Sequence, residues 1–165
     1  MKMPQALLGA LSLAVCALFA DSAQAQTRAA LVQNVDEPGR TPYSELKSAN
    51  CFGSQLCRLL FSAVPAGKRL VLTNINGYTH VTSGTLPDIA VVSWTATPTP
   101  TQVSMTATRG ATFSAGVTRM YVNQTVLAFF GPGDVPLAAF DLRDTSDTLA
   151  GNTQLQLTGY YISLP

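Results

Sequence analysis

Short threonine-rich runs separated by frequent turn residues are the feature that most restricts the fold of this chain. Nineteen of the 165 residues are threonines, and eighteen of them follow Arg28. Threonine and other β-branched residues favour pleated strands, whereas Glu and Lys, which favour helices, are scarce here. Turn residues recur roughly every 8–15 positions, a spacing that is typical of a sandwich or barrel. The sequence therefore predicts an all-β fold.

Nine runs are predicted to form strands, and together they indicate one antiparallel β-sandwich, jelly-roll-like, of about eight or nine strands. Pro65-Ala66-Gly67 is predicted to close a tight hairpin between the third and fourth runs, because Pro fixes φ and Gly completes the turn. The runs are Ala29–Val35, Tyr43–Ser48, Arg58–Val64, Arg69–Tyr78, Asp88–Thr95, Gln102–Thr108, Thr118–Phe130, Val135–Leu142 and Gln154–Leu164.

Two segments, Asp88–Thr95 and Val126–Phe130, are apolar on both of their faces. One face of such a strand can pack in the sandwich core, but the other must be covered by a loop, a second subunit or a ligand. A structural or assembly protein that forms a homo-oligomer through these strands is therefore an alternative to a ligand-binding module. In Gln154–Leu164, Gly159 marks either a β-bulge or a strand with two half-buried faces.

The first 25 residues have the parts of a secretory signal peptide. Lys2 gives a basic start, Ala6–Ala20 is an apolar run, and Ala23-Gln24-Ala25 supplies the small residues of an A-x-A site. This pattern predicts cleavage after Ala25 and a mature domain, residues 26–165, that is secreted or periplasmic. A lipobox ending at Cys16 is the rival interpretation, which the bulky Val15 disfavours. No run is long enough for a membrane span.

Cys51 and Cys57 are the cysteines of the mature chain. The exported compartment is oxidising, so the sequence predicts a structural disulfide between them. A redox-active pair is disfavoured, because the spacing is not C-x-x-C and no βαβ context surrounds it.

Charge and ligand counts exclude several functions. A net charge of +1 with only 12% charged residues excludes a basic nucleic-acid surface. One His and three Cys are too few for a Cys/His metal cluster, and no cofactor is predicted. Asp141, Asp144 and Asp147 form a weak calcium candidate, with Arg143 as a competing positive charge.

The sequence gives little support for a hydrolase of the serine–histidine or two-carboxylate kind. His80 is the only histidine, and no G-x-S-x-G elbow accompanies it. Most carboxylates fall in predicted turns, where acids usually serve solvation, so a hydrolase that uses two carboxylates is the less favoured interpretation. The sequence predicts a protein that is not an enzyme.

Aromatic side chains are the remaining candidates for a binding function, because the apolar faces of sugar rings stack on them. Trp94, Tyr160 and Tyr161 are the predicted ligand-binding residues, and Tyr78 and Tyr121 are further aromatic candidates. Tyr160 and Tyr161 must point to opposite faces of their strand. The ligand class that this favours is a carbohydrate or another cell-envelope component.

Three short segments of the sequence resemble segments of small secreted bacterial β-sandwich proteins of unassigned function. They are Leu31–Arg40 (LVQNVDEPGR), Val64–Leu72 (VPAGKRLVL) and Leu157–Tyr161 (LTGYY). The resemblance implies export and a sandwich fold, and it transfers no catalytic motif.

Overall fold

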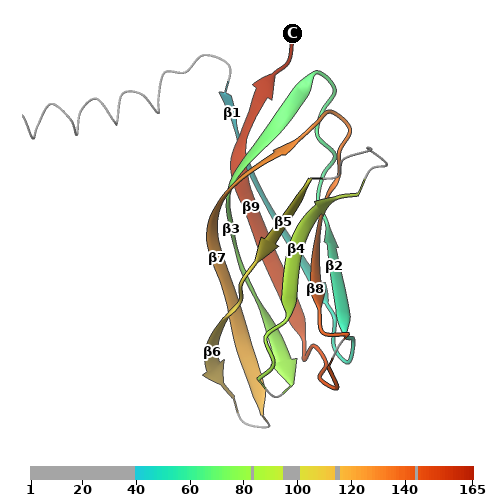
Figure 1. Ribbon diagram of the computed structural model, residues 1–165, viewed down its shortest axis with the longest axis vertical. Helices are drawn as coiled ribbons and strands as arrows, with labels where there is room; N and C mark the ends of the chain where they lie inside the picture. Colours follow the sequence, from blue (N-terminus) through green and yellow to red (C-terminus); the bar gives the residue numbers. More distant parts are fainter. Residues whose placement is uncertain (1–39, 83, 95–100, 114–115, 144) are drawn as a thin grey trace, which may run out of the picture. The chain divides into compact units, whose positions relative to one another are not determined.

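The computed structural model describes residues 40–82, 84–94, 101–113, 116–143 and 145–165. Two antiparallel sheets stack as a β-sandwich, as predicted (Figure 1). Sheet A has the order β1-β9-β3-β7-β6 and sheet B the order β2-β8-β4-β5. The strands are β1 (Arg40–Asn50), β2 (Leu56–Leu60), β3 (Lys68–Thr82), β4 (Asp88–Ser93), β5 (Gln102–Met105), β6 (Thr108–Thr112), β7 (Val117–Phe130), β8 (Pro136–Asp141) and β9 (Asn152–Ser163).

The strand order is that of a jelly roll with one addition. Apart from β6, each sheet has four strands. The chain passes between the sheets at every connection except those from β4 to β5 and from β6 to β7. The predicted strand Ala29–Val35 and the predicted signal peptide lie outside the described residues. No helix in the described ranges is long and apolar enough to cross a membrane.

The core lies between the two sheets, and alternate residues of the strands face it. In β4, Ile89 and Val91 are buried, whereas Ala90 and Val92 on the opposite side are half-buried. The inward residues of sheet A meet those of sheet B in one hydrophobic cluster. Its largest fully buried side chains include Leu70, Leu72, Ile75, Met120, Phe130, Phe140, Leu155 and Leu157.

The predicted hairpin at Pro65-Ala66-Gly67 is wrong. β2 pairs with β8 in sheet B, whereas β3 pairs with β7 and β9 in sheet A. The Lys68 N–H donates to the Pro65 carbonyl at 3.1 Å, so a turn does form, but Val64 before it is buried in the core. Burial of Val64 directs the chain from one sheet across to the other. The predicted strand Gln102–Thr108 likewise divides into β5 and the start of β6, which belong to different sheets.

The irregularity predicted at Gly159 lies on the neighbouring strand. Leu72 of β3 pairs with Gly159 of β9, and the next pair along the strands is Asn74 with Thr158. Thr73 is therefore an extra residue on β3 with no partner in the register. The Thr73 hydroxyl donates to the Thr158 carbonyl at 3.2 Å. β9 pairs with β1 without a register shift, and its residues from Thr158 to Ile162 are half-buried on both faces, which is the second of the two predicted interpretations. The extra residue is on β3.

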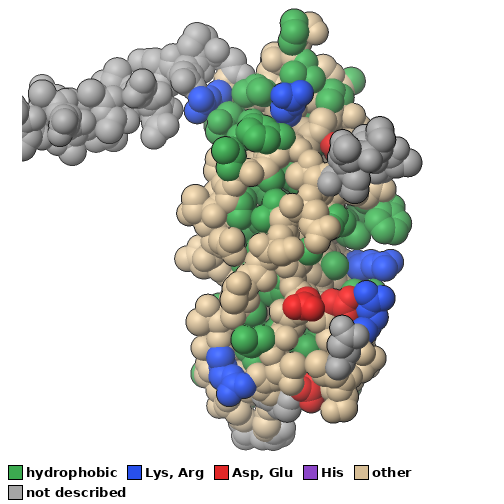
Figure 2. All heavy atoms as spheres, in the orientation of Figure 1, with side chains coloured by type: hydrophobic (Ala, Val, Ile, Leu, Met, Phe, Trp, Pro, Cys, Tyr) green, Lys and Arg blue, Asp and Glu red, His purple; other side chains and the backbone are tan. Residues whose placement is uncertain are grey.

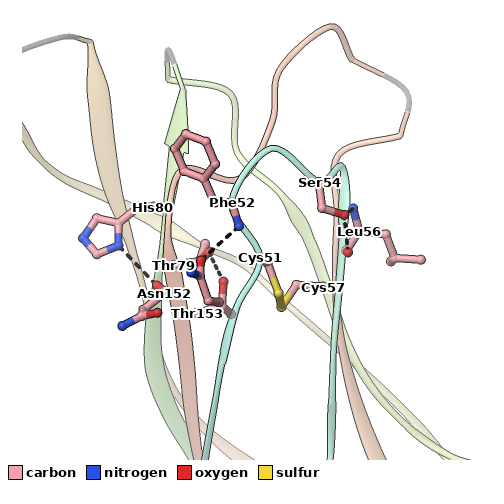
Figure 3. Close-up of a disulfide and its surroundings, with 10 residues drawn as sticks. Cys51, Phe52, Ser54, Leu56, Cys57, Thr79, His80, Asn152 and Thr153 are labelled. Carbon is pink, nitrogen blue, oxygen red and sulfur yellow. Dashed lines mark hydrogen bonds between the residues drawn. A yellow bond between two sulfur atoms is a disulfide. The ribbon is translucent and has the colours of Figure 1, made fainter.

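The disulfide between Cys51 and Cys57 forms, as predicted (Figure 3). Cys51 follows β1 of sheet A and Cys57 lies in β2 of sheet B, so the bridge joins the two sheets. Backbone hydrogen bonds hold the loop against the chain before β9: Gly53 N–H donates to the Leu149 carbonyl at 2.8 Å, and Leu149 N–H donates to the Ser54 carbonyl at 2.8 Å.

Glu45 joins β1 to the segment that follows β2. Its carboxylate accepts hydrogen bonds from the Tyr43 hydroxyl at 3.0 Å and from the Ser62 N–H at 3.0 Å, and it pairs with Lys47 at 2.9 Å. Burial by itself would raise the pKa of Glu45, but the hydrogen bonds from Lys47, Ser62 and Tyr43 outweigh it and lower that pKa below its usual value of 4.5.

The lowered pKa of Glu45 makes stability depend on pH at this position. The carboxylate stabilises the fold above about pH 4.5, its usual pKa, and this contribution is lost as the pH falls through the lower folded-state pKa. We expect Glu45→Gln to melt at a lower temperature than the wild type at neutral pH, and the difference to close in acid. Thermal melts of both proteins across this range measure it, and a difference that stays constant would contradict it.

Candidate functional site

The outer face of sheet A, the side away from the core, carries six rows of side chains that the strand register places side by side. Residues of neighbouring strands that pair in register point to the same face. From one end to the other the rows are Asn152/His80/Arg119, Ser48/Gln154/Tyr78/Tyr121, Leu46/Gln156/Asn76/Asn123, Ser44/Thr158/Asn74/Thr125, Pro42/Tyr160/Val71/Phe129 and Arg40/Ile162/Arg69. We call this surface the outer face.

One end of the outer face is a cluster around Arg119. The Arg119 guanidinium carbon lies 4.9 Å from the ring centre of Tyr78, 5.2 Å from that of Phe113 and 6.0 Å from that of Tyr121. The Tyr121 ring lies against Gly110 of β6, where a Cβ atom would come within 2.3 Å of it. We call Tyr78, His80, Phe113, Arg119 and Tyr121 the Arg119 cluster.

The hydrogen bonds of His80 fix its tautomer. Arg119 Nε–H donates to His80 Nε2 at 3.0 Å, so Nε2 carries no proton. His80 Nδ1 lies 3.2 Å from the Asn152 carbonyl oxygen, to which it must donate (Figure 3). Both ring nitrogens are therefore occupied by structural partners, and the imidazole as placed has no nitrogen left to act as a general base.

Amide side chains follow the Arg119 cluster along the strands. Asn76 on β3 pairs in register with Asn123 on β7, beside Tyr78 and Tyr121. These four side chains and the backbone between them line an open hollow of about 590 Å³. Asn76 Nδ2 donates to Asn74 Oδ1 at 3.4 Å, which holds one amide by another. The hollow thus combines aromatic rings with amide donors and acceptors on two adjacent strands.

The far end of the outer face is aromatic and basic. Tyr160, Val71 and Phe129 form one row across β9, β3 and β7, and Phe129 is 48% exposed. In the next row Arg40 and Arg69 flank Ile162. The Arg40 guanidinium carbon lies 4.4 Å from the ring centre of Tyr160, in cation–π contact.

The three predicted ligand-binding residues do not form one site. Trp94 follows β4 on sheet B, is 58% exposed, and has the Arg58 guanidinium carbon 5.7 Å from its ring centre. Tyr161 faces the core side of sheet A, where its ring meets that of Tyr43 edge to face at 5.3 Å. Tyr160, as the neighbour of Tyr161, points to the outer face.

Two residues of the weak calcium candidate, Asp141 and Asp147, lie in the described part of the chain, and each has a protein partner. Arg143 donates two hydrogen bonds to Oδ2 of Asp141, from Nε at 2.8 Å and from Nη2 at 2.5 Å. These hydrogen bonds lower the pKa of Asp141, and they outweigh the partial burial that would raise it. Asp147 accepts a hydrogen bond from Thr85, and Asp144 lies outside the described residues. Within the part of the chain that the structure describes, no three His, Cys, Asp or Glu side chains are grouped to hold a metal ion.

Sheet B presents a different surface. Leu60, Leu137 and Val92 pair in one row on its outer side, with Ala139 and Ala90 in the next. Figure 2 shows acidic and basic side chains next to each other among hydrophobic ones on the face that it presents. Asp141 at the end of β8 forms an ion pair with Arg143, whose Nη2 lies 2.5 Å from Oδ2.

Comparisons with known proteins add little to this description. The chain matches no protein-family model and no curated protein. A solved structure of a family two carbohydrate esterase from Cellvibrio japonicus is similar over 74% of this chain and 36% of that chain, at 15% identity and a TM-score of 0.25. This chain therefore spans about a third of that protein's length, and a likeness this low carries no argument about fold or activity.

Proposed function

We propose that this chain is an exported, non-enzymatic β-sandwich module that binds a cell-envelope carbohydrate through the outer face of sheet A. The observation that carries the proposal is the composition of that face: aromatic rings at both ends and, between them, amide and hydroxyl side chains with Leu46 at the edge. Sugars expose hydroxyl groups, which need donors and acceptors, and apolar ring faces, which stack on aromatic rings.

The rigid position of these side chains supports the proposal. They project from long paired strands rather than from loops, and sites on regular elements hold their geometry more closely. Some amides are also held in place: Gln156 Nε2 donates to the Ser44 hydroxyl at 2.9 Å, and Asn74 Nδ2 donates to the Gln124 carbonyl at 3.3 Å. A preorganised face loses less conformational entropy when a ligand binds.

Three further observations agree with an exported protein that is not an enzyme. The only histidine has both nitrogens in use. Glycoside hydrolysis requires two facing carboxylates, and none of the described acids lies in the six rows of the outer face. The oxidised Cys51–Cys57 pair is a feature of proteins that leave the reducing cytosol.

A glycan array, followed by titration of the sugars retained, tests the proposal. We expect the mature chain to bind a subset of envelope glycans and Tyr121→Ala to weaken that binding at least about ten-fold, because stacking on the ring is lost. Asn123→Ala removes an amide of the same hollow from an exposed position and is expected to weaken binding without affecting the fold.

Trp94→Ala is the matched control, because it removes an exposed aromatic ring from the other sheet. It should bind the retained glycans as the wild type does. A blank array, or loss of binding in Trp94→Ala but not in Tyr121→Ala, would contradict the proposal. Circular dichroism of each variant confirms that the sandwich is intact.

A further inference from the structure

We propose that the carbohydrate recognised by the outer face is acidic and lies along the strands, with its anionic groups directed to Arg119 at one end and Arg69 at the other. This inference rests on the proposed function and names the class of glycan. It follows from the sign of the charge, from the length of the face and from the hydrogen-bonding capacity of the arginines.

The sign of the charge is uniform across the outer face. Among the described residues, the charged side chains in its six rows are Arg40, Arg69 and Arg119, although the whole chain has a net charge of only +1. The acids among the described residues are elsewhere. Glu45 points to the core side, where it accepts a hydrogen bond from Ser62, and Asp134 is buried and accepts one from Ser93. Asp88 and Asp141 pair on the outer side of sheet B. Asp147 accepts a hydrogen bond from Thr85 in a loop.

This segregation produces a positive surface on a nearly neutral protein. A face lined by charges of one sign attracts ligands of the opposite sign and repels those of the same sign. A neutral glycan would only accept hydrogen bonds from the arginines, whereas carboxylate or sulfate groups would accept the same hydrogen bonds and also pair with the charge. Charge complementarity therefore selects an acidic ligand over a neutral one.

Arg119 is held in a position that suits an anion. Its Nε–H is used by His80, and the three rings of the cluster surround the guanidinium. This is the hydrogen bond described for Arg119, and it uses Nε–H, which leaves the terminal N–H groups as donors for an anion. A planar guanidinium presents paired donors that match the two oxygens of a carboxylate.

The length of the face requires more than one sugar. Asn152 and Ile162 of β9 lie in the first and last rows, ten residues apart, which corresponds to about 33 Å of extended strand. A single monosaccharide cannot reach both arginine ends over this distance. An oligosaccharide or polysaccharide that carries repeated anionic groups can contact both, with amides beneath its middle.

Two matched pairs of polymers test the inference. Dextran sulfate is compared with dextran, and polygalacturonate with the same polymer after reduction of its carboxylates to alcohols. We expect the acidic member of at least one pair to bind at least about ten-fold more tightly. Raising NaCl from about 20 mM to about 300 mM should weaken that binding markedly, because salt screens exposed charges. The two pairs distinguish sulfate from carboxylate as the anion.

Three variants locate the interaction. Arg69→Ala and Arg119→Ala should each reduce the preference for the acidic polymer, and the double variant should abolish it. Arg58→Ala is the control, because it removes one positive charge from sheet B, where the guanidinium faces Trp94. Equal losses in Arg58→Ala and Arg69→Ala would overturn the inference by showing a general charge effect.

The remaining outcomes separate this inference from the proposed function. If neutral and acidic members bind equally and Tyr121→Ala weakens both, the glycan site stands and its acidic preference is wrong. If no polymer in the two pairs binds and the glycan array is also blank, both proposals fail. If a single-stranded DNA of similar length binds as tightly as the acidic glycans, the face recognises polyanions in general and the inference is overturned.

Discussion

Replacing Gly159 with alanine is expected to lower the free energy of unfolding by about 3 kcal/mol, at the upper end of the usual cost of overpacking. A Cβ at this position would come within 2.0 Å of the Val71 carbonyl oxygen and 3.0 Å of the Leu72 Cα. Both obstacles are backbone atoms of the adjacent strand, so no side-chain rotation can relieve the clash. Thermal or urea unfolding, monitored by circular dichroism, measures the effect.

Gly131→Ala is the control for this substitution. A Cβ at Gly131 meets only the Asp134 carboxylate, at an ordinary contact distance of 3.5 Å. We expect its stability to stay within about 1 kcal/mol of the wild type. A Gly159→Ala protein as stable as Gly131→Ala would show that β9 does not approach β3 as closely as the structure indicates.

Removing the disulfide with the double substitution Cys51→Ala and Cys57→Ala is expected to cost about 2 kcal/mol. The bridge closes a short loop, and a loop of this size restricts the unfolded chain by roughly that amount in the chain-entropy model. Urea unfolding of the oxidised wild type, the reduced wild type and the double variant measures it.

The reduced wild type should unfold at nearly the same urea concentration as the double variant, because both lack the same covalent link. If the double variant matches the oxidised wild type instead, the bridge adds nothing to stability, and the hydrogen bonds of Gly53 and Ser54 suffice to hold the loop. Glycan binding should persist in all three, since the loop contributes no side chain to the outer face.

The strands could be predicted because their signals are local. Threonine-rich runs separated by turn residues indicated a sandwich, and the apolar segment Asp88–Thr95 contains β4, whose Ile89 and Val91 are buried in the core. The pairing of the strands was harder to predict from the sequence. Val64-Pro65-Ala66-Gly67 has the chemistry of a hairpin turn, yet the burial of Val64 leads the chain into the other sheet. The competition between a local turn and tertiary burial cannot be read from the turn residues.

The candidate site was less predictable than the fold. Tyr78 and Tyr121 were recognisable as aromatic candidates, but they meet only because β3 and β7 pair in one register, across more than forty residues of sequence. Arg119 gave no signal of its own, since a lone arginine in a strand usually faces solvent. Trp94 was the most conspicuous aromatic residue in the sequence, and it lies on the other sheet.

The register shift between Leu72 and Asn74 separates the Val71 row from the Asn74 row of the outer face, and it affects the shape of the ligand that we propose for this face. Across it β9 advances from Gly159 to Thr158, β3 from Leu72 to Asn74, and β7 from Ala128 to Thr125. Because the three strands cover unequal path lengths there, the sheet must coil, and the rows on one side are turned relative to those on the other. A polymer that runs along the whole outer face, as proposed above, would have to follow this turn between the Asn74 row and the Val71 row.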